Sequence, residues 1–254
     1  PNVDQLIITN TDLVNPLVVG PIDLSGPQNV ITDLILNGGG AFIFTTPILL
    51  PNNFLFDFSE AGAVTNLTIG NFDVITYGLN GGDPLGTTAL ESALWGEIIG
   101  NGLPGQRINI QLNEDVGDAS DAVNGGFNSS GVEIYVATDL NGEDRSVATC
   151  VNTQDITTLG LQGNYENELT YANTERGIEF LMEVVYVKDQ GYVVGSLVTD
   201  FAREGGTAVI DVVGLQALPE GEVQKVAGID VTDAISVTIN VTGGDTIIED
   251  FDTD

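Results

Sequence analysis

Apolar and polar residues alternate along several segments of the chain, and this alternation limits the possible fold more than any other feature. The clearest example has Ile235, Val237, Ile239 and Val241 interleaved with Ser236, Thr238, Asn240 and Thr242. Segments 107–113 and 132–136 repeat the pattern. Because successive side chains of a β-strand point to opposite faces, each segment predicts a strand with one buried and one solvated face.

The same reasoning predicts strands along most of the chain, separated by tight turns. They are expected at Val3–Thr9, Val30–Leu36, Ala41–Thr45, Phe72–Tyr77, Ile178–Val187, Tyr192–Val198, Ala208–Val213 and Glu222–Val226. Asn-Gly pairs such as Asn37-Gly38 and Asn141-Gly142 favour hairpin turns. Strands with one solvated face are typical of antiparallel sheets. We therefore expect an all-β protein, an antiparallel jelly-roll barrel or sandwich with elaborated loops, and we find no repeat of fixed period.

One segment has the spacing of a helix instead. Thr88 and Glu91 form a capping box, Leu90, Leu94 and Ile98 share one helical stripe that Trp95 flanks, and Gly100 can end the helix. The sequence predicts one short helix over 89–99. Such a helix can close the end of a barrel or dock a neighbouring subunit, and we favour the first because an amphipathic helix needs only its own core as partner.

The domain organisation is expected to be a single β-rich chain over 1–254. A polar, Asp- and Gly-rich stretch at 113–131 is the candidate boundary to a second small β-lobe, or a long inserted loop. The C-terminal segment, Asp245–Asp254, predicts either a final strand or an arm that reaches a neighbour.

The charge is strongly one-sided, with 37 acidic residues, 6 basic residues and a formal net charge of −31. The basic residues are scattered, so direct binding of nucleic acid is excluded and contact with anionic lipid is disfavoured. Self-repulsion of this size is largely screened at molar salt, where the Debye length falls to about 3 Å. We expect a protein adapted to high salt; the alternative is an acidic extracellular protein neutralised by divalent cations.

The chain contains no histidine and a single cysteine, Cys150, which excludes several catalytic designs. Neither a Ser-His-Asp triad nor an intrachain disulfide can form. We therefore predict that the chain has no enzyme activity and that it contains no catalytic residue, no cofactor-binding residue and no metal ligand. No apolar run has the length of a membrane span. Pro1–Asp4 lacks the features of a signal peptide. Either a signal peptide was cleaved before Pro1 or only an initiator methionine was lost, and the second, simpler alternative implies synthesis in the cytoplasm.

Two kinds of local motif remain. The loop Asp139–Asp144 places oxygen ligands at alternate positions, as calcium loops do, but it lacks the glycine and the final glutamate of such loops. A solvated turn is the simpler interpretation, and calcium is the alternative. Asn66, Asn128 and Asn240 match the glycosylation acceptor pattern, which matters only on a secretory route.

Taken together, the alternating strands, the start at Pro1 and the Asp-rich loops at 113–121 and 139–144 resemble the capsid proteins of membrane-containing icosahedral viruses of halophilic archaea. This resemblance implies upright jelly-roll subunits, a homo-oligomeric shell with a second coat protein as partner, and a location in the virion after synthesis in the host cytoplasm. The expected function is then self-assembly into a capsid or surface lattice.

Two alternatives belong to other functional classes. The first is a secreted filament or adhesion subunit, extracellular or on the cell surface, that is joined to its neighbour by strand addition. The second is a carbohydrate-binding module or enzyme, which needs a cleft with converging acids and aromatic side chains.

Overall fold

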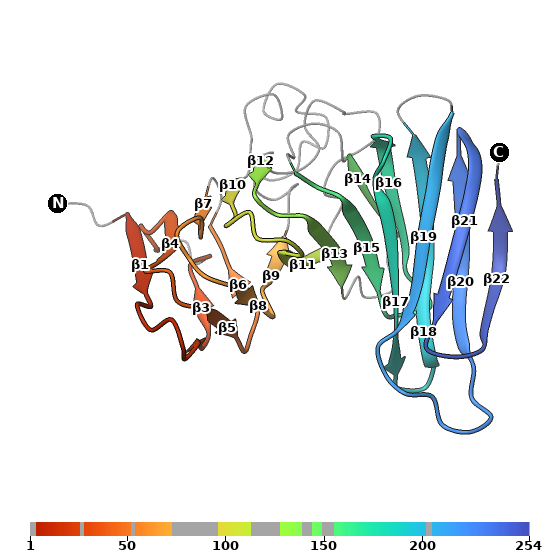
Figure 1. Ribbon diagram of the computed structural model, residues 1–254, viewed down its shortest axis with the longest axis horizontal. Helices are drawn as coiled ribbons and strands as arrows, with labels where there is room; N and C mark the ends of the chain where they lie inside the picture. The colour runs from red at the N-terminus through yellow and green to blue at the C-terminus, as the bar shows by residue number, and fades with distance from the viewer. Residues whose placement is uncertain are drawn as a thin grey trace. The chain divides into compact units, whose positions relative to one another are not determined.

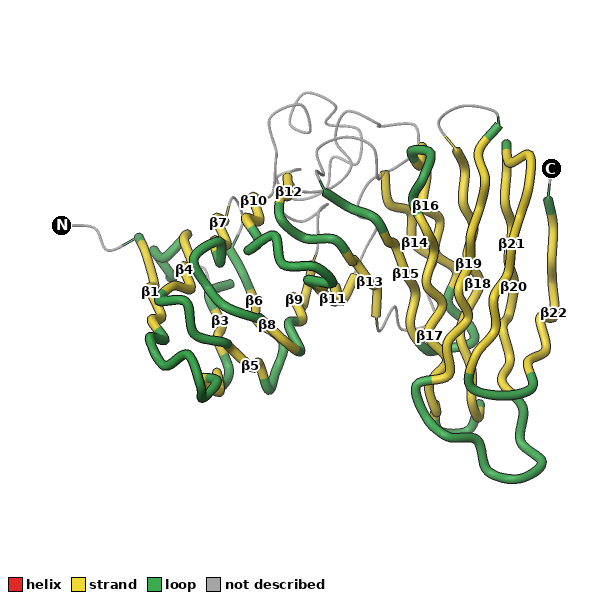
Figure 2. Tube along the Cα trace, viewed as in Figure 1, coloured by secondary structure: helices red, strands yellow, loops and turns green. Residues whose placement is uncertain are grey.

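The computed structural model describes residues 4–25, 28–51, 54–72, 96–112, 128–138, 144–148, 155–201 and 205–253. These residues form 22 β-strands and no helix, so the expectation of an all-β protein is confirmed (Figures 1 and 2). The chain divides into two compact units, Pro1–Gln111 with Gly126–Tyr135 and Asn152–Ile156, and Leu112–Gly125 with Val136–Val151 and Thr157–Asp254. We refer to them as unit 1 and unit 2.

Unit 1 is a coil of short parallel strands. Its strands are β1 (Gln5–Thr9), β2 (Leu17–Val19), β3 (Ile22–Asp23), β4 (Asp33–Asn37), β5 (Phe42–Phe44), β6 (Ile48–Leu49), β7 (Phe54–Asp57), β8 (Val64–Thr65), β9 (Thr68–Phe72), β10 (Gly96–Ile99), β11 (Arg107–Leu112) and β12 (Asn128–Ser130). Each strand from β1 to β7 pairs in parallel with the strand three places later, which ends with the pair β7–β10. Three strands therefore make one turn of the coil.

The core of unit 1 consists of side chains stacked from coil to coil. Leu34 is in register with Phe56, and Phe56 with Ile98; all three are fully buried. Phe56 also contacts Phe58, with ring centroids 5.0 Å apart. Burying each such side chain is worth about 1.5–3 kcal/mol, so the stack stabilises the coil without any pairing of distant turns.

A close backbone contact forms one corner of this coil. The Gly40 amide donates a hydrogen bond to the Asn10 carbonyl at 2.8 Å, and the Asn10 side-chain amide donates to the Ala41 carbonyl at 2.8 Å. Gly38 has a φ of +98°, and a Cβ atom there would lie 2.5 Å from the same Asn10 carbonyl oxygen. Only glycine fits this position without strain.

Unit 2 is a coil with two strands in each turn. Its strands are β14 (Asp144–Ala148), β15 (Thr158–Gln162), β16 (Glu168–Thr174), β17 (Glu179–Val187), β18 (Gly191–Phe201), β19 (Gly206–Gly214), β20 (Gln224–Thr232), β21 (Ala234–Thr242) and β22 (Thr246–Asp252). The strand β13 (Ile134–Thr138) is divided between the two units. Each strand of unit 2 pairs in parallel with the strand two places later.

This pairing builds two layers, which we call the odd layer (β15, β17, β19, β21) and the even layer (β14, β16, β18, β20, β22). Apolar side chains fill the space between them. In the odd layer, Phe180 and Ile210 are in register and fully buried. In the even layer, Leu197 and Ile229 are in register and buried. The Tyr171 hydroxyl donates a hydrogen bond to the Gly160 carbonyl at 2.7 Å and so ties one layer to the other.

The prediction of antiparallel pairing is wrong for these sheets. The strand pairs that link successive turns of both coils are parallel, whereas the β17–β18 hairpin, in which Val185 lies opposite Val193, is antiparallel. Alternation of apolar and polar residues indicates only that one face of a strand is buried. Strands in the wall of a parallel coil have one buried face, as do strands of a jelly roll, so the pattern does not distinguish the two folds. Parallel neighbours need a long connection, which here is a strand of another sheet or layer. No jelly roll is found among the described strands.

The prediction of a helix over 89–99 is also wrong where it can be checked. Gly96–Ile99 is strand β10, and Ile98 is fully buried between neighbouring strands. Residues 89–95 lie outside the described part. Gly100 does not end a helix but lies against Gly131, whose carbonyl oxygen would be 2.2 Å from an added Cβ atom. The predicted boundary or insertion at 113–131 falls mostly on residues that are not described and stays a prediction.

Candidate functional site

The last coil of unit 2 has two open edges. Among the described strands, β21 pairs only with β19, and β22 pairs only with β20. Figure 1 shows β22 as the outermost strand of the even layer. The amide and carbonyl groups on the outer side of an edge strand form a template for a further strand. This coil is therefore the first candidate for an interaction site.

Burial falls sharply along the stacks that reach these edges. Leu197 and Ile229 are buried, whereas Phe251, in register with Ile229, is 50% exposed. Val212 is fully buried, whereas Val241, its register partner, is 43% exposed. The apolar interior of the coil is thus open at this end, which favours contact with another apolar surface.

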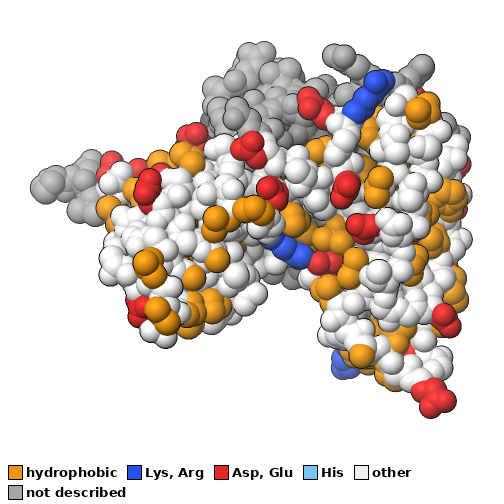
Figure 3. All heavy atoms as spheres, in the orientation of Figure 1, with side chains coloured by type: hydrophobic (Ala, Val, Ile, Leu, Met, Phe, Trp, Pro, Cys, Tyr) orange, Lys and Arg blue, Asp and Glu red, His pale blue; other side chains and the backbone are white. Residues whose placement is uncertain are grey.

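The two edge strands differ in charge. β21 carries no charged residue over its nine positions and is the longest described strand without one. Its outward row is held by hydrogen bonds from Ser236 to Thr207 at 3.3 Å and from Asn240 to Asp211 at 2.8 Å. β22 carries three acids, Glu249, Asp250 and Asp252. On the face of the molecule drawn in Figure 3, acidic side chains are scattered singly between wide uncharged areas.

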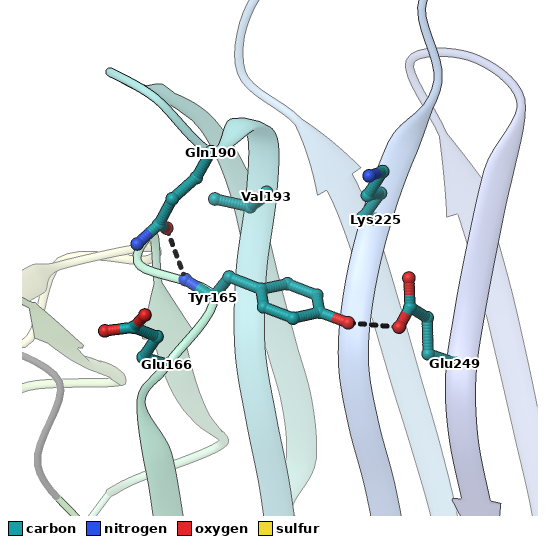
Figure 4. A pocket seen from close by; sticks show the side chains of 6 residues that line it. All are labelled: Tyr165, Glu166, Gln190, Val193, Lys225 and Glu249. Atoms are coloured by element: carbon teal, nitrogen blue, oxygen red, sulfur yellow. Dashed lines mark hydrogen bonds between the residues drawn. The ribbon is translucent and has the colours of Figure 1, made fainter.

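A small cavity lies on unit 2 beside the even layer (Figure 4). It has a volume of about 280 Å³ and is lined by Tyr165, Glu166, Gln190, Val193, Lys225 and Glu249. The turn before β16 supplies the first two residues, the β17–β18 hairpin the third, and strands β18, β20 and β22 the others. Four separate segments therefore meet at this cavity.

Hydrogen bonds fix Tyr165 in the cavity. Its hydroxyl donates to the Glu249 carboxylate, and its backbone amide donates to the Gln190 side-chain oxygen at 2.8 Å. Gln190 in turn donates to the Asn164 side-chain oxygen at 3.1 Å. The hydrogen bond to Glu249, together with burial and the negative charge, raises the pKa of Tyr165 to about 12. The hydroxyl is thus a donor at neutral pH, and it fastens β22 to the turn before β16.

The sequence motifs are not brought together by the structure. Residues 139–143 of the calcium candidate lie outside the described part, and only Asp144, the first residue of β14, is placed. In the described ranges, no group of three or more Cys, Asp or Glu side chains is placed to hold a metal ion. Cys150 and the acids at 114–121 also lie outside these ranges.

The glycosylation motifs occupy separate positions. Asn66 is exposed in the turn between β8 and β9 with a φ of 55°, and Asn240 is exposed on β21, where its amide binds Asp211. Asn128 begins β12.

Sequence reasoning missed the cavity, although it allowed a final strand within Asp245–Asp254, where the structure has β22. Tyr165 and Glu249 are 84 residues apart, and no short-range pattern joins them. Along the described residues, no helix has the length and hydropathy needed to cross a membrane. Comparison of the chain with protein-family models, curated proteins and solved structures finds no match.

Proposed function

We propose that this chain is a structural protein that assembles with its neighbours by adding strands to open sheet edges. One observation carries the proposal: among the described strands, β21 and β22 each pair on one side only, and they expose part of the apolar interior of unit 2 as well as unpaired backbone groups. Strand addition uses the first for hydrogen bonds and the second for side-chain contacts. Of the functions expected from the sequence, the filament or adhesion subunit uses these features most directly.

The virion coat expected from the sequence implied upright jelly rolls, which the described parallel strands do not form. Self-assembly itself does not depend on the jelly roll. A coil of parallel strands contacts only its neighbouring coils and offers an edge at each end, a geometry suited to extended structural proteins. An extracellular or cell-surface location fits such a subunit.

Charge sets the conditions for assembly. Two chains with a formal net charge of −31 each repel one another in dilute buffer. At molar salt this repulsion is screened within about 3 Å, so that short-range contacts at the edges decide the outcome. Assembly is therefore expected to strengthen as salt rises, in keeping with a high-salt environment.

The test is the particle mass of the purified chain by light scattering, from about 0.1 M to about 3 M salt, the range over which screening changes most. Uniform particles larger than one chain are expected to appear as salt rises, with unchanged β-structure by circular dichroism. A folded monomer at every salt concentration would overturn the proposal. Binding of that monomer to a glycan panel would then favour the carbohydrate-binding alternative.

A further inference from the structure

We infer that β21 is the contact between two copies of this chain, which pair antiparallel about a two-fold axis at Thr238. This inference rests on the proposed function and adds to it the strand, the register and the symmetry of the contact. It starts from what β21 lacks. Natural edge strands are protected against pairing by charged residues, proline, bulges or short length. The nine residues of β21 include no charged residue and no proline, and the register shift against β19 at Ile235 lies near the start of the strand, outside Ser236–Thr242.

When β21 pairs with β21 of a second copy, its apolar side chains lie opposite apolar side chains and its polar side chains lie opposite polar ones. About Thr238, Val237 lies opposite Ile239 of the partner subunit, and Ser236 lies opposite Asn240 of the partner subunit. The apolar row thus continues from one copy into the other, and so does the polar row. A shift by one residue would exchange the rows, so the pattern itself selects this parity of register. β-Branched side chains in facing positions add favourable cross-strand contacts.

Pairing of β21 with the first coil of unit 1 in another copy is the alternative. The first coil of unit 1 has three short edge strands, β1, β2 and β3, with five, three and two residues. About Thr238, the regular part of β21 pairs with itself over the five residues Ser236–Asn240, because its register with β19 shifts at Ile235, and β1 also offers five residues. A two-fold pair occupies the β21 edges of both copies and is the commonest symmetry of soluble oligomers, which favours it over a head-to-tail chain.

The acidic edge makes this contact dependent on salt. β21 and β22 end the two layers of one coil, so an axis through Thr238 and normal to the layers also directs the two β22 edges toward one another. Each contributes Glu249, Asp250 and Asp252. Like charges in facing strands are unfavourable, and salt screens them. Pairing through β21 is thus weakest in dilute buffer and strengthens as salt rises.

The first test is sedimentation equilibrium of the full chain and of Thr238→Asp, each from about 0.1 M to about 3 M salt. The variant places two carboxylates beside each other at the axis, and we expect its dissociation constant to rise more than about tenfold. Thr65→Asp is the matched control: it makes the same charge change at an exposed site of unit 1 and should dissociate as the wild type does. An unchanged dissociation constant for Thr238→Asp overturns the inference.

A second test reads the register directly. With Cys150 replaced by serine, Thr238→Cys should form a disulfide between copies, since facing Cα atoms about 4.5–5.5 Å apart permit one. Ser236→Cys alone should not, whereas Ser236→Cys combined with Asn240→Cys should. A wild type that associates while Thr238→Cys stays uncrosslinked overturns only the inference. A wild type that is monomeric at every salt concentration overturns the proposed function as well.

Discussion

The hydroxyl of Tyr165 donates a hydrogen bond to the carboxylate of Glu249, across 84 residues of sequence. The bond joins the turn before β16 to the last strand of the even layer, with β18 and β20 between them. An edge strand with one paired side thus gains a second attachment.

Replacement of Tyr165 by phenylalanine should loosen β22 without unfolding unit 2. The lost bond lies at an exposed site, so we expect a decrease of less than about 1 kcal/mol in the free energy of unfolding. Hydrogen exchange should speed up at the amides of β22 and stay unchanged at those of β17. Equal acceleration in both strands would contradict a local role.

The same bond predicts a pH dependence above neutrality. The folded-state pKa of Tyr165 is raised to about 12 from an ordinary value of about 10, so its stabilising effect is complete below about pH 10. It is lost as pH rises from about 10 to about 12. Burial also raises the pKa values of Tyr135 and Tyr171 and so acts in the same direction. The difference between wild type and Tyr165→Phe in urea unfolding isolates the Tyr165 contribution, which should disappear over this window.

The core of unit 2 should be sensitive at Phe180. Its ring is fully buried, with centroids 6.3 Å from those of Tyr171 and Phe201. Phe180→Ala should lower the free energy of unfolding by about 3–5 kcal/mol through lost burial and the cavity it leaves. Leu215→Ala, at a side chain that is 47% exposed, should change it by less than about 0.5 kcal/mol. Chemical denaturation of both variants checks the contrast.

Two glycines with positive φ separate backbone strain from a steric clash. At Gly38, an added Cβ meets the Asn10 carbonyl oxygen at 2.5 Å; at Gly102, with a φ of +64°, it meets nothing within 4 Å. Gly102→Ala should cost about 1 kcal/mol for the left-handed backbone alone. Gly38→Ala should lower the melting temperature distinctly further, because the corner must move. Equal shifts would show that the close contact is not important.

Salt should act on the stability of the last coil as well as on assembly. Asp252 is in register with Asp230 on the neighbouring strand, and like charges in this arrangement destabilise a sheet by about 0.2–1 kcal/mol. Asp252→Asn should therefore be more stable than the wild type in dilute buffer and gain less stability from added salt. Unfolding midpoints at about 0.05 M and about 1 M salt test this at concentrations where the chain is monomeric.

Many of the long strands were predictable from the sequence, but strands such as β15 and β16 were missed, and the pairing partners were not predictable. The alternation over 235–242 gives β21 nearly to the residue. Its parallel pairing with β19 has no local signal, because the distance between register partners changes from coil to coil. Asn240 and Asp211 are 29 residues apart, whereas Thr246 and Gln224 are 22 apart. A repeat of variable length escapes a search for a fixed period.

The helix prediction failed for a related reason. Leu94 and Ile98 satisfy a helical spacing, yet Ile98 is buried in β10 through contacts with strands far away in the sequence. Tertiary packing overrides local preference in such short segments. The candidate site shows the same limit, since each residue of the cavity is unremarkable alone and only the register of the even layer brings Tyr165 to Glu249.

Pairing restricted to adjacent coils also has a consequence for how this chain can change in length. A deletion or insertion in the sequence can remove or add one whole strand of a layer, and the neighbouring strand or the added strand then becomes the exposed edge. Removal of Thr246–Asp252 would make β20 the new edge and uncover Val226 and Ile229, which are now buried. The coil should therefore tolerate insertion or deletion of a complete turn best. An insertion or deletion shorter than a turn should change the register of the residues that follow it in the same turn.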